Sequence, residues 1–123
     1  MAQRIRIFHC DDSEAFTRLV RHWLDEHDGL EYVGGAHTGD AAIDALPEAR
    51  PDVVLLDTMG SPGDLALLRR IRTAVPQARV IVYSGYLSIM NSDQLGGEAD
   101  AYLAKSDDEA TLVTTIRAVV ARG

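Results

Sequence analysis

The chain lacks several features that would mark other classes of protein. It has a single cysteine, Cys10, which excludes an internal disulfide and fits a reducing compartment. Its 12 basic against 19 acidic residues give a net charge of −7, which argues against nucleic-acid binding because phosphates need clustered basic side chains. No apolar stretch approaches the roughly 20 residues of a membrane-spanning helix. We therefore expect neither nucleic acid nor membrane among its partners.

What remains is the composition of an ordinary soluble domain. Hydrophobic residues make up 46% and charged residues 25% of the 123 residues, which suits one domain, residues 1–123, with its own core. The first four residues run directly into a predicted strand, and they show no signal-peptide pattern. The expected location is the cytoplasm.

Short apolar segments alternate five times with segments of helical periodicity. The predicted strands are Ile5–Phe8, Glu31–Ala36, Val53–Leu56, Arg79–Tyr83 and Ala101–Leu103. The predicted helices run from an N-cap at Ser13 through Leu24, from Thr38 through Leu46, from Leu65 to Val75, over Ser88–Leu95, and from a capping box at Ser106–Glu109 through Val120. Pro47 and Pro51 are expected to bracket a loop. This alternation predicts an α/β fold with a five-stranded parallel sheet and five helices covering both faces.

Polar side chains follow four of the predicted strands. Asp11 and Asp12 follow the first, Asp57 follows the third, Ser84 the fourth and Lys105 the fifth. The carboxyl ends of parallel strands meet at one edge of the sheet, where open α/β folds keep their sites. Carboxylate oxygens suit Mg²⁺, which binds through one or two carboxylates and keeps several waters. The pattern therefore predicts a site for a divalent cation and a phosphoryl group.

These positions, in register with the fivefold strand and helix pattern, resemble the receiver domain of two-component response regulators. The resemblance implies a doubly wound, flavodoxin-like fold in which Asp57 accepts a phosphoryl group from a histidine kinase. It implies that Asp11, Asp12, Asp57 and the backbone carbonyl of Met59 hold Mg²⁺, with Asp11 acting through water. Lys105 would pair with a phosphoryl oxygen. Such a domain catalyses its own phosphorylation and dephosphorylation but is not an enzyme with an external substrate.

The resemblance also implies a switch and a set of partners. Ser84 would turn toward the phosphoryl group, and the ring of Tyr102 would turn inward behind it, which alters a protein-interaction surface. The expected partners are a histidine kinase and a downstream protein or effector domain, and a homodimer formed on phosphorylation is also allowed. The Lys105–Ser106 pair resembles the branch that often carries a C-terminal helix-turn-helix effector. A single-domain regulator and a longer protein with such an effector both remain open.

The chain departs from the family pattern in three places. In the loop after Asp57, Pro62 lies one residue late and Leu65 stands where the family has glycine, which leaves the Met59 ligand open. Ser106 replaces the usual proline, so a trans peptide bond is expected there.

Met59 and Tyr86 are expected to shield the phosphoryl group from water and to slow its hydrolysis.

Other functions suit this sequence less well. A flavin site would need a phosphate-cradling loop of small and hydroxyl residues after the first strand, where this chain has carboxylates that repel phosphate. A hydrolase would need a nucleophile–base pair, and none is visible. A closer alternative is a receiver-like module that is never phosphorylated and binds a partner constitutively. His9 and Cys10 show no metal-ligand spacing, so we interpret His9 as a polar core or edge residue and Cys10 as a small buried hydrophobe.

Overall fold

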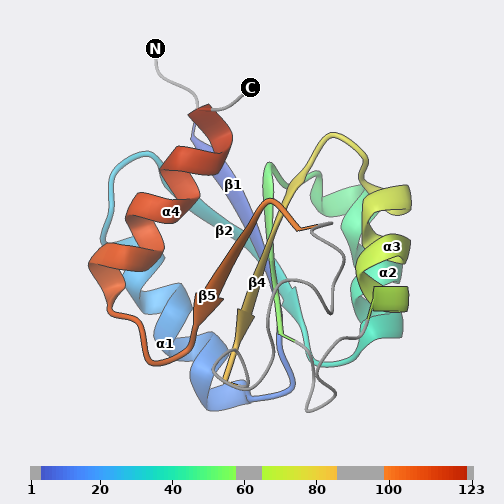
Figure 1. Ribbon diagram of the computed structural model, residues 1–123, viewed down its shortest axis with the longest axis horizontal. Coiled ribbons are helices and arrows are strands. Elements are labelled where there is room, and N and C mark those ends of the chain that lie inside the picture. Colours follow the sequence, from blue (N-terminus) through green and yellow to red (C-terminus); the bar gives the residue numbers. More distant parts are fainter. Residues whose placement is uncertain (1–3, 58–64, 86–98, 122–123) are drawn as a thin grey trace.

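The sheet has five parallel strands, as the sequence predicts. A computed structural model describes residues 4–57, 65–85 and 99–121 (Figure 1). The strands are β1 (Ile5–Cys10), β2 (Leu30–Ala36), β3 (Val53–Leu56), β4 (Arg79–Ser84) and β5 (Ala101–Ala104). They lie in the order β2-β1-β3-β4-β5, and all four neighbouring pairs are parallel. This is the doubly wound, flavodoxin-like order, in which the chain adds β2 on one side of β1 and β3 to β5 on the other, so that the strand order reverses between β1 and β3.

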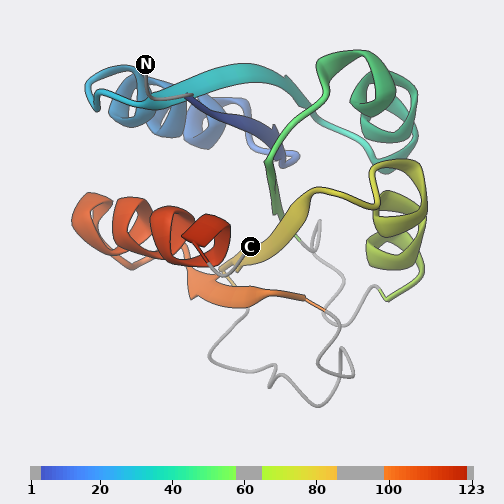
Figure 2. The same cartoon turned by 90° about the horizontal axis from the view of Figure 1, so that it is seen from above.

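Helices cover both faces of the sheet. The four helices of the described residues are α1 (Glu14–Asp25), α2 (Gly39–Ala49), α3 (Leu65–Ala74) and α4 (Glu109–Ala121). Figure 2 shows α1 and α4 on one side of the sheet and α2 and α3 on the other. The helix predicted over Ser88–Leu95 lies outside the described residues.

Each face of the sheet has its own apolar core because side chains of a strand alternate between the faces. On β1, Ile7 packs with residues of α1 and α4, whereas Phe8 and Cys10 pack with residues of α2 and α3. Ile7 is completely buried, and such a side chain stabilises the fold by roughly 1.5–3 kcal/mol. The central strands are therefore rigid supports for the residues that follow them.

The edge strand β2 contains an irregularity. Ile7 pairs with Tyr32, but Phe8 pairs with Gly34, so the register shifts between these two positions of β1. Val33 is the extra residue, as in a β-bulge. Past the shift, regular pairing resumes and ends with Cys10 opposite Ala36.

Two of the predicted N-caps are confirmed and one is wrong. The Phe16 N–H donates to Ser13 Oγ (3.2 Å) and the Ala41 N–H to Thr38 Oγ1 (3.1 Å). At α4, however, the Thr111 N–H donates to Asp108 Oδ1 (2.8 Å), so Asp108 caps this helix and Ser106 does not. The expected capping box fails because the Glu109 carboxylate lies 2.6 Å from His27 Nε2 instead of bonding back to the cap.

The prediction that α2 ends before Pro47 is also wrong. The helix continues through Pro47 to Ala49, and Arg50 closes it in a left-handed conformation with its N–H on the Leu46 carbonyl. Pro47 has no N–H for the carbonyl of Ile43, four residues earlier, and its ring crowds that carbonyl. This disruption lies in the last turn of α2, and the helix ends two residues later at Ala49. No helix among the described residues combines the length and the apolar character needed to cross a bilayer.

Candidate functional site

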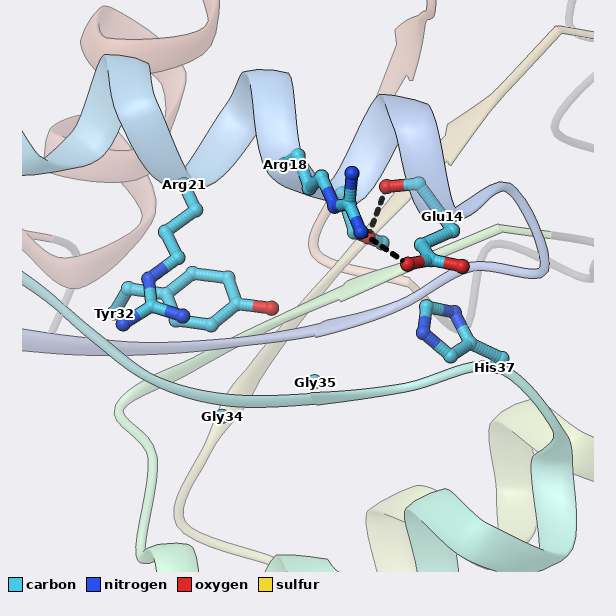
Figure 3. A pocket seen from close by; sticks show the side chains of 8 residues that line it. Glu14, Arg18, Arg21, Tyr32, Gly34, Gly35 and His37 are labelled. Carbon is cyan, nitrogen blue, oxygen red and sulfur yellow. Dashed lines mark hydrogen bonds and ion pairs between the residues drawn. The ribbon is translucent and has the colours of Figure 1, made fainter.

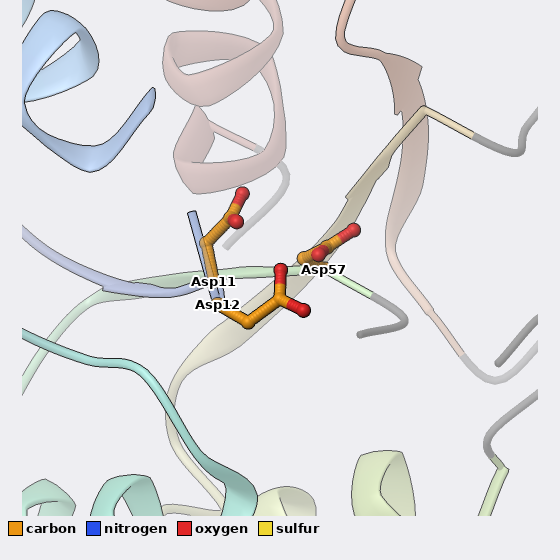
Figure 4. Close-up of side chains that lie close together, drawn as sticks. All are labelled: Asp11, Asp12 and Asp57. Atoms are coloured by element: carbon orange, nitrogen blue, oxygen red, sulfur yellow. The ribbon is translucent and has the colours of Figure 1, made fainter. Parts of the chain in front are cut away.

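Three carboxylates meet at the carboxyl edge of the sheet. Asp11 and Asp12 follow β1, and Asp57 follows β3, its neighbour in the sheet. One oxygen from each lies within 4.8 Å of the others, and Figure 4 shows the three side chains gathered at this edge. The Asp57 N–H donates to the Cys10 carbonyl at 2.9 Å, which ties the two strand ends together. The cluster follows from the β1–β3 pairing.

The residues of this cluster fit a hard divalent cation. Asp11 and Asp57 are almost completely buried, at 0% and 3% exposure, while Asp12 is exposed. Oxygen ligands of this kind are those that Mg²⁺ takes in proteins. The other expected ligand, the carbonyl of Met59, lies outside the described residues.

Lys105 supplies the positive charge. It follows β5, and its backbone N–H donates to the Ser84 carbonyl at 3.1 Å. Its Nζ lies 2.9 Å from Asp11 Oδ2 and 3.5 Å from Asp57 Oδ2, and 4.8 Å from the centroid of the Phe16 ring. The Lys105–Ser106 peptide bond is trans, as expected. The lysine thus bridges two of the three carboxylates.

The burial of these charges and their mutual attraction have opposite effects on their pKa values. Burial raises the pKa of Asp11, but His9, Lys105 and the Ser13 N–H together bring it below its usual range. Burial likewise lowers the pKa of Lys105, and the two carboxylates outweigh this and raise it. Both groups are therefore charged at neutral pH.

The family of the chain follows from a match that covers most of its length. Residues 7–117 match the family model described as the response regulator receiver domain. The chain belongs to this family. The resemblance inferred from the aspartates and the lysine is thereby confirmed.

Curated relatives of this receiver domain are longer proteins. A protein-glutamate methylesterase/protein-glutamine glutaminase of Trichodesmium erythraeum is 34% identical over 106 residues, which cover 83% of this chain and 30% of that protein. The response regulator GacA of Pseudomonas viridiflava is 29% identical over 123 residues, covering 95% of this chain and 56% of the relative. The receiver domain thus spans less than two thirds of the length of these relatives.

Solved structures agree with the fold. The crystal structure of a LuxR-family two-component response regulator from Aurantimonas has a TM-score of 0.83 at 27% identity, covering 97% of this chain and 86% of that one. The response regulator domain of Thermotoga maritima CheB has a TM-score of 0.78 at 25% identity, covering 97% and 98%.

The predicted switch residues lie on the two neighbouring strands β4 and β5. Ser84 ends β4 and is completely buried, and Tyr102 lies opposite Val82 in the β4–β5 pairing. The Tyr102 hydroxyl is shielded from solvent and has no hydrogen-bond partner among the described residues. Tyr86, expected to flank the phosphoryl group, lies outside them. The receiver domain therefore brings Ser84 and Lys105 to the same strand ends.

Sequence reasoning missed two histidines around Asp11. His37 Nδ1 lies 2.9 Å from the Asp11 backbone carbonyl, and His9 Nε2 lies 3.4 Å from Asp11 Oδ2. His9 is a core residue, as expected, but its contact with Asp11 was not foreseen. The spacing in the sequence could have indicated this contact, because residues two apart in an extended segment point to the same side.

Cys10 is a structural residue of this receiver domain. Burial and the neighbouring carboxylates, Asp11 first among them, raise the pKa of its thiol to about 12. A thiol with such a pKa is unreactive at neutral pH. The interpretation of Cys10 as a small buried hydrophobe is thus consistent with its surroundings in the core beside α2 and α3.

A separate hollow of about 340 Å³ lies between α1 and β2 (Figure 3). Its two arginines already have partners: Arg18 is paired with Glu14, and Arg21 lies 5.3 Å from the centroid of the Tyr32 ring. Glu14 thus neutralises one of the two arginines, whereas the stacking on Tyr32 leaves the charge of Arg21 in place. The hollow gathers no group of carboxylates from the described residues, and the cluster of Asp11, Asp12 and Asp57 is the better candidate site for a cation and a phosphoryl group.

Proposed function

We propose that this receiver domain accepts a phosphoryl group on Asp57 from a phosphohistidine of a histidine kinase. The observation that carries the proposal is the position of Lys105, whose ammonium group lies 3.5 Å from Asp57 Oδ2 beside two further carboxylates. A cation beside the attacking oxygen suits a phosphoryl group, whose oxygens carry negative charge in the transition state.

Asp11, Asp12 and Asp57 would hold Mg²⁺, together with the backbone carbonyl of Met59. When bound, Mg²⁺ would neutralise charge on the phosphoryl oxygens and relieve the repulsion between the carboxylates. Lys105 and the three aspartates sum to two negative charges, and a divalent cation brings this sum to zero. The charge balance thus supports a site that is completed by a metal.

The reaction exchanges one bond at phosphorus. An oxygen of the Asp57 carboxylate attacks phosphorus and forms an acyl phosphate, while the bond from phosphorus to the imidazole nitrogen of the kinase breaks. The electron pair of that bond stays with the leaving imidazole. Lys105 pairs with a phosphoryl oxygen, and the Ser84 hydroxyl donates to another. Hydrolysis later breaks the acyl phosphate and restores Asp57.

The output is a change of protein contacts. Ser84 and Tyr102 lie on the two adjacent strands at the β5 edge, so a movement of one can reach the other through this pair of strands. A downstream protein or a linked effector domain would recognise the altered surface, and phosphorylation can also favour a homodimer. We place this protein in the cytoplasm and expect the receiver domain itself to bind neither nucleic acid nor membrane.

The proposal is tested by intact mass after incubation with acetyl phosphate and Mg²⁺. One phosphoryl adduct is expected, and it should be absent from a sample in which a chelator has removed the metal. Purified phosphorylated kinase should serve as a second donor. A protein that gains no adduct from either donor and binds no Mg²⁺ would instead be the constitutive interaction module.

The proposed switch makes a spectroscopic prediction. Beryllofluoride, which mimics a phosphoryl group, should shift the ring resonances of Tyr102 in an NMR spectrum of the protein with labelled tyrosines. Those of Tyr32, which lies beside α1 on the opposite edge strand, should change little. A Ser84→Ala variant should lose most of the Tyr102 shift while still binding beryllofluoride. Unchanged Tyr102 resonances in the wild-type protein would contradict the switch.

A further inference from the structure

His9 is a fully buried polar side chain that the proposed reaction does not use. Its exposure is 0%, and the Phe16 and Tyr83 rings lie 5.9 and 6.0 Å from its own ring centroid. Neither ring nitrogen has a hydrogen bond of normal geometry among the described residues. Burying two polar atoms without partners costs free energy. Packing alone would be better served by an apolar ring, so the polar atoms call for a reason.

The position of His9 beside Asp11 supplies a reason for its polar atoms. His9 and Asp11 are two residues apart at the end of β1, so both point to the face that α1 covers. His9 Nε2 lies 3.4 Å from Asp11 Oδ2, and both side chains are completely buried. The distance is slightly longer than a normal N–H···O bond, which is 2.7–3.2 Å. A small rotation of either side chain would close it.

The charges explain when that rotation would matter. In the structure, Lys105 Nζ lies 2.9 Å from Asp11 Oδ2 and 3.1 Å from Asp11 Oδ1. The Ser13 N–H also donates to Asp11 Oδ1, at 2.8 Å. Lys105 cannot hold both Asp11 and a phosphoryl group on Asp57 equally closely. When it turns to the phosphoryl group, Asp11, which would hold Mg²⁺ only through water, loses its direct contact with an ammonium group while remaining buried. A buried carboxylate that loses its partner is strongly destabilised.

We infer that His9 is a positioning residue that holds Asp11 in place, through Nε2–H donated to Asp11 Oδ2, when Lys105 turns to the phosphoryl group. A neutral imidazole protonated on Nε2 suffices. The Phe16 and Tyr83 rings fix the plane of the imidazole, so the donor stays aimed at the carboxylate. This inference rests on the proposed function of Asp57, but the contact between His9 and Asp11 can be tested without it.

The test compares side chains that differ in whether a donor reaches Asp11. His9→Gln places an amide near the position of Nε2, whereas His9→Asn places the same amide near Nδ1, too short to reach. His9→Phe keeps the aromatic stack and removes the donor. Tyr83→Phe is the control, because it alters the same aromatic cluster and the Tyr83 hydroxyl has no hydrogen-bond partner among the described residues. Mg²⁺ dissociation constants are measured by calorimetry for all four variants.

Loss of an outer partner of a metal site typically weakens metal binding at least about tenfold. We therefore expect about tenfold weaker Mg²⁺ binding for His9→Phe and His9→Asn, and values within about twofold of wild type for His9→Gln and Tyr83→Phe. Equal affinities for His9→Gln and His9→Asn, or a wild-type affinity for His9→Phe, would show that His9 only packs.

A metal-free measurement separates this inference from the proposed function. In the presence of a chelator, and in a Lys105→Met background that takes the ammonium group away from Asp11 as the turn would, His9→Phe and Asp11→Ala are combined in a double-mutant cycle of unfolding equilibria. If His9 contacts Asp11, the effects of the two substitutions should depart from independence by a factor of about three or more. Independent effects would overturn the inference. Should the wild-type protein bind no Mg²⁺, the proposed function would fall, and this cycle would still decide the role of His9.

Discussion

Asp57→Asn should abolish the phosphoryl adduct completely. The amide keeps the size and most hydrogen bonds of the carboxylate, but it lacks the anionic oxygen that attacks phosphorus. The variant is expected to fold, because Asp57 carries one charge in a crowded acidic cluster and its N–H bond to the Cys10 carbonyl is a backbone contact. The effect should therefore be all or none in intact mass, with little change in far-UV circular dichroism.

The matched control for this prediction is Asp44→Asn. Asp44 lies on an exposed position of α2, so its substitution makes the same change in charge away from the carboxyl edge of the sheet. Asp44→Asn should gain one adduct as the wild-type protein does. An adduct on Asp57→Asn at the wild-type level would place the phosphoacceptor elsewhere and remove the central role given to Asp57.

Lys105→Met should destabilise the metal-free protein by about 3 kcal/mol at pH 7, because breaking a buried ion pair from one side leaves an uncompensated charge. The Asp11 side chain has no exposure and that of Lys105 has 22%, so solvent screens this pair little. Methionine keeps the length of the aliphatic stem, which limits the loss to the charge. Urea denaturation with a chelator present measures the difference in unfolding free energy.

The pH dependence of that difference has a definite sign. The folded protein lowers the pKa of Asp11, so this contribution is present above the unfolded value of about 3.9 and is lost as pH falls through the folded value. The folded protein raises the pKa of Lys105, so that contribution is present below the unfolded value and is lost as pH rises through the folded one. The gap between wild type and Lys105→Met should thus be widest near neutral pH and narrow at both extremes.

A double variant tests whether the unpaired charge of Asp11 causes the loss of stability in Lys105→Met. In Lys105→Met combined with Asp11→Asn, the buried position no longer carries an unpaired charge, so much of the lost stability should return. A loss for Lys105→Met below about 0.5 kcal/mol, the size of an exposed pair, would mean that the bridge to Asp11 contributes little. A loss of equal size in the double variant would show that the unpaired charge of Asp11 is not the cause.

The residues that gather at the carboxyl edge of the sheet could be predicted from the sequence, because their meeting depends only on the strands being parallel. Apolar runs followed by Asp11, Asp57 and Lys105 place these residues at one edge as soon as the strands are parallel, whatever the details of the helices. This is why three carboxylates and a lysine from distant parts of the chain are found together. Met59 lies outside the described residues, and its role stays a prediction.

The sequence pattern predicted the wrong N-cap for α4 because several neighbouring residues can form a cap. Three of the four residues in Ser106–Glu109 can cap a helix, and the neighbours in space decided among them: Asp107 accepts the Ala104 N–H, and His27 engages Glu109. Ser106 lies three residues before the helix begins at Glu109, and Asp108, directly before it, forms the cap. The contact of His9 with Asp11 was hidden for a related reason, since a buried histidine in a strand is usually explained by packing alone.

The irregular edge strand has a consequence for the behaviour of the protein in concentrated solution. A long, regular edge exposes a row of backbone donors and acceptors on which a second molecule can add a strand, and this is one route to aggregation. Here one edge, β2, is interrupted at Val33, and the other, β5, has only 4 residues. Neither edge is a long, flat template for intermolecular pairing. The sheet thus carries the candidate site at the carboxyl ends of its strands, while its two edge strands are poor sites for the addition of a strand from another molecule.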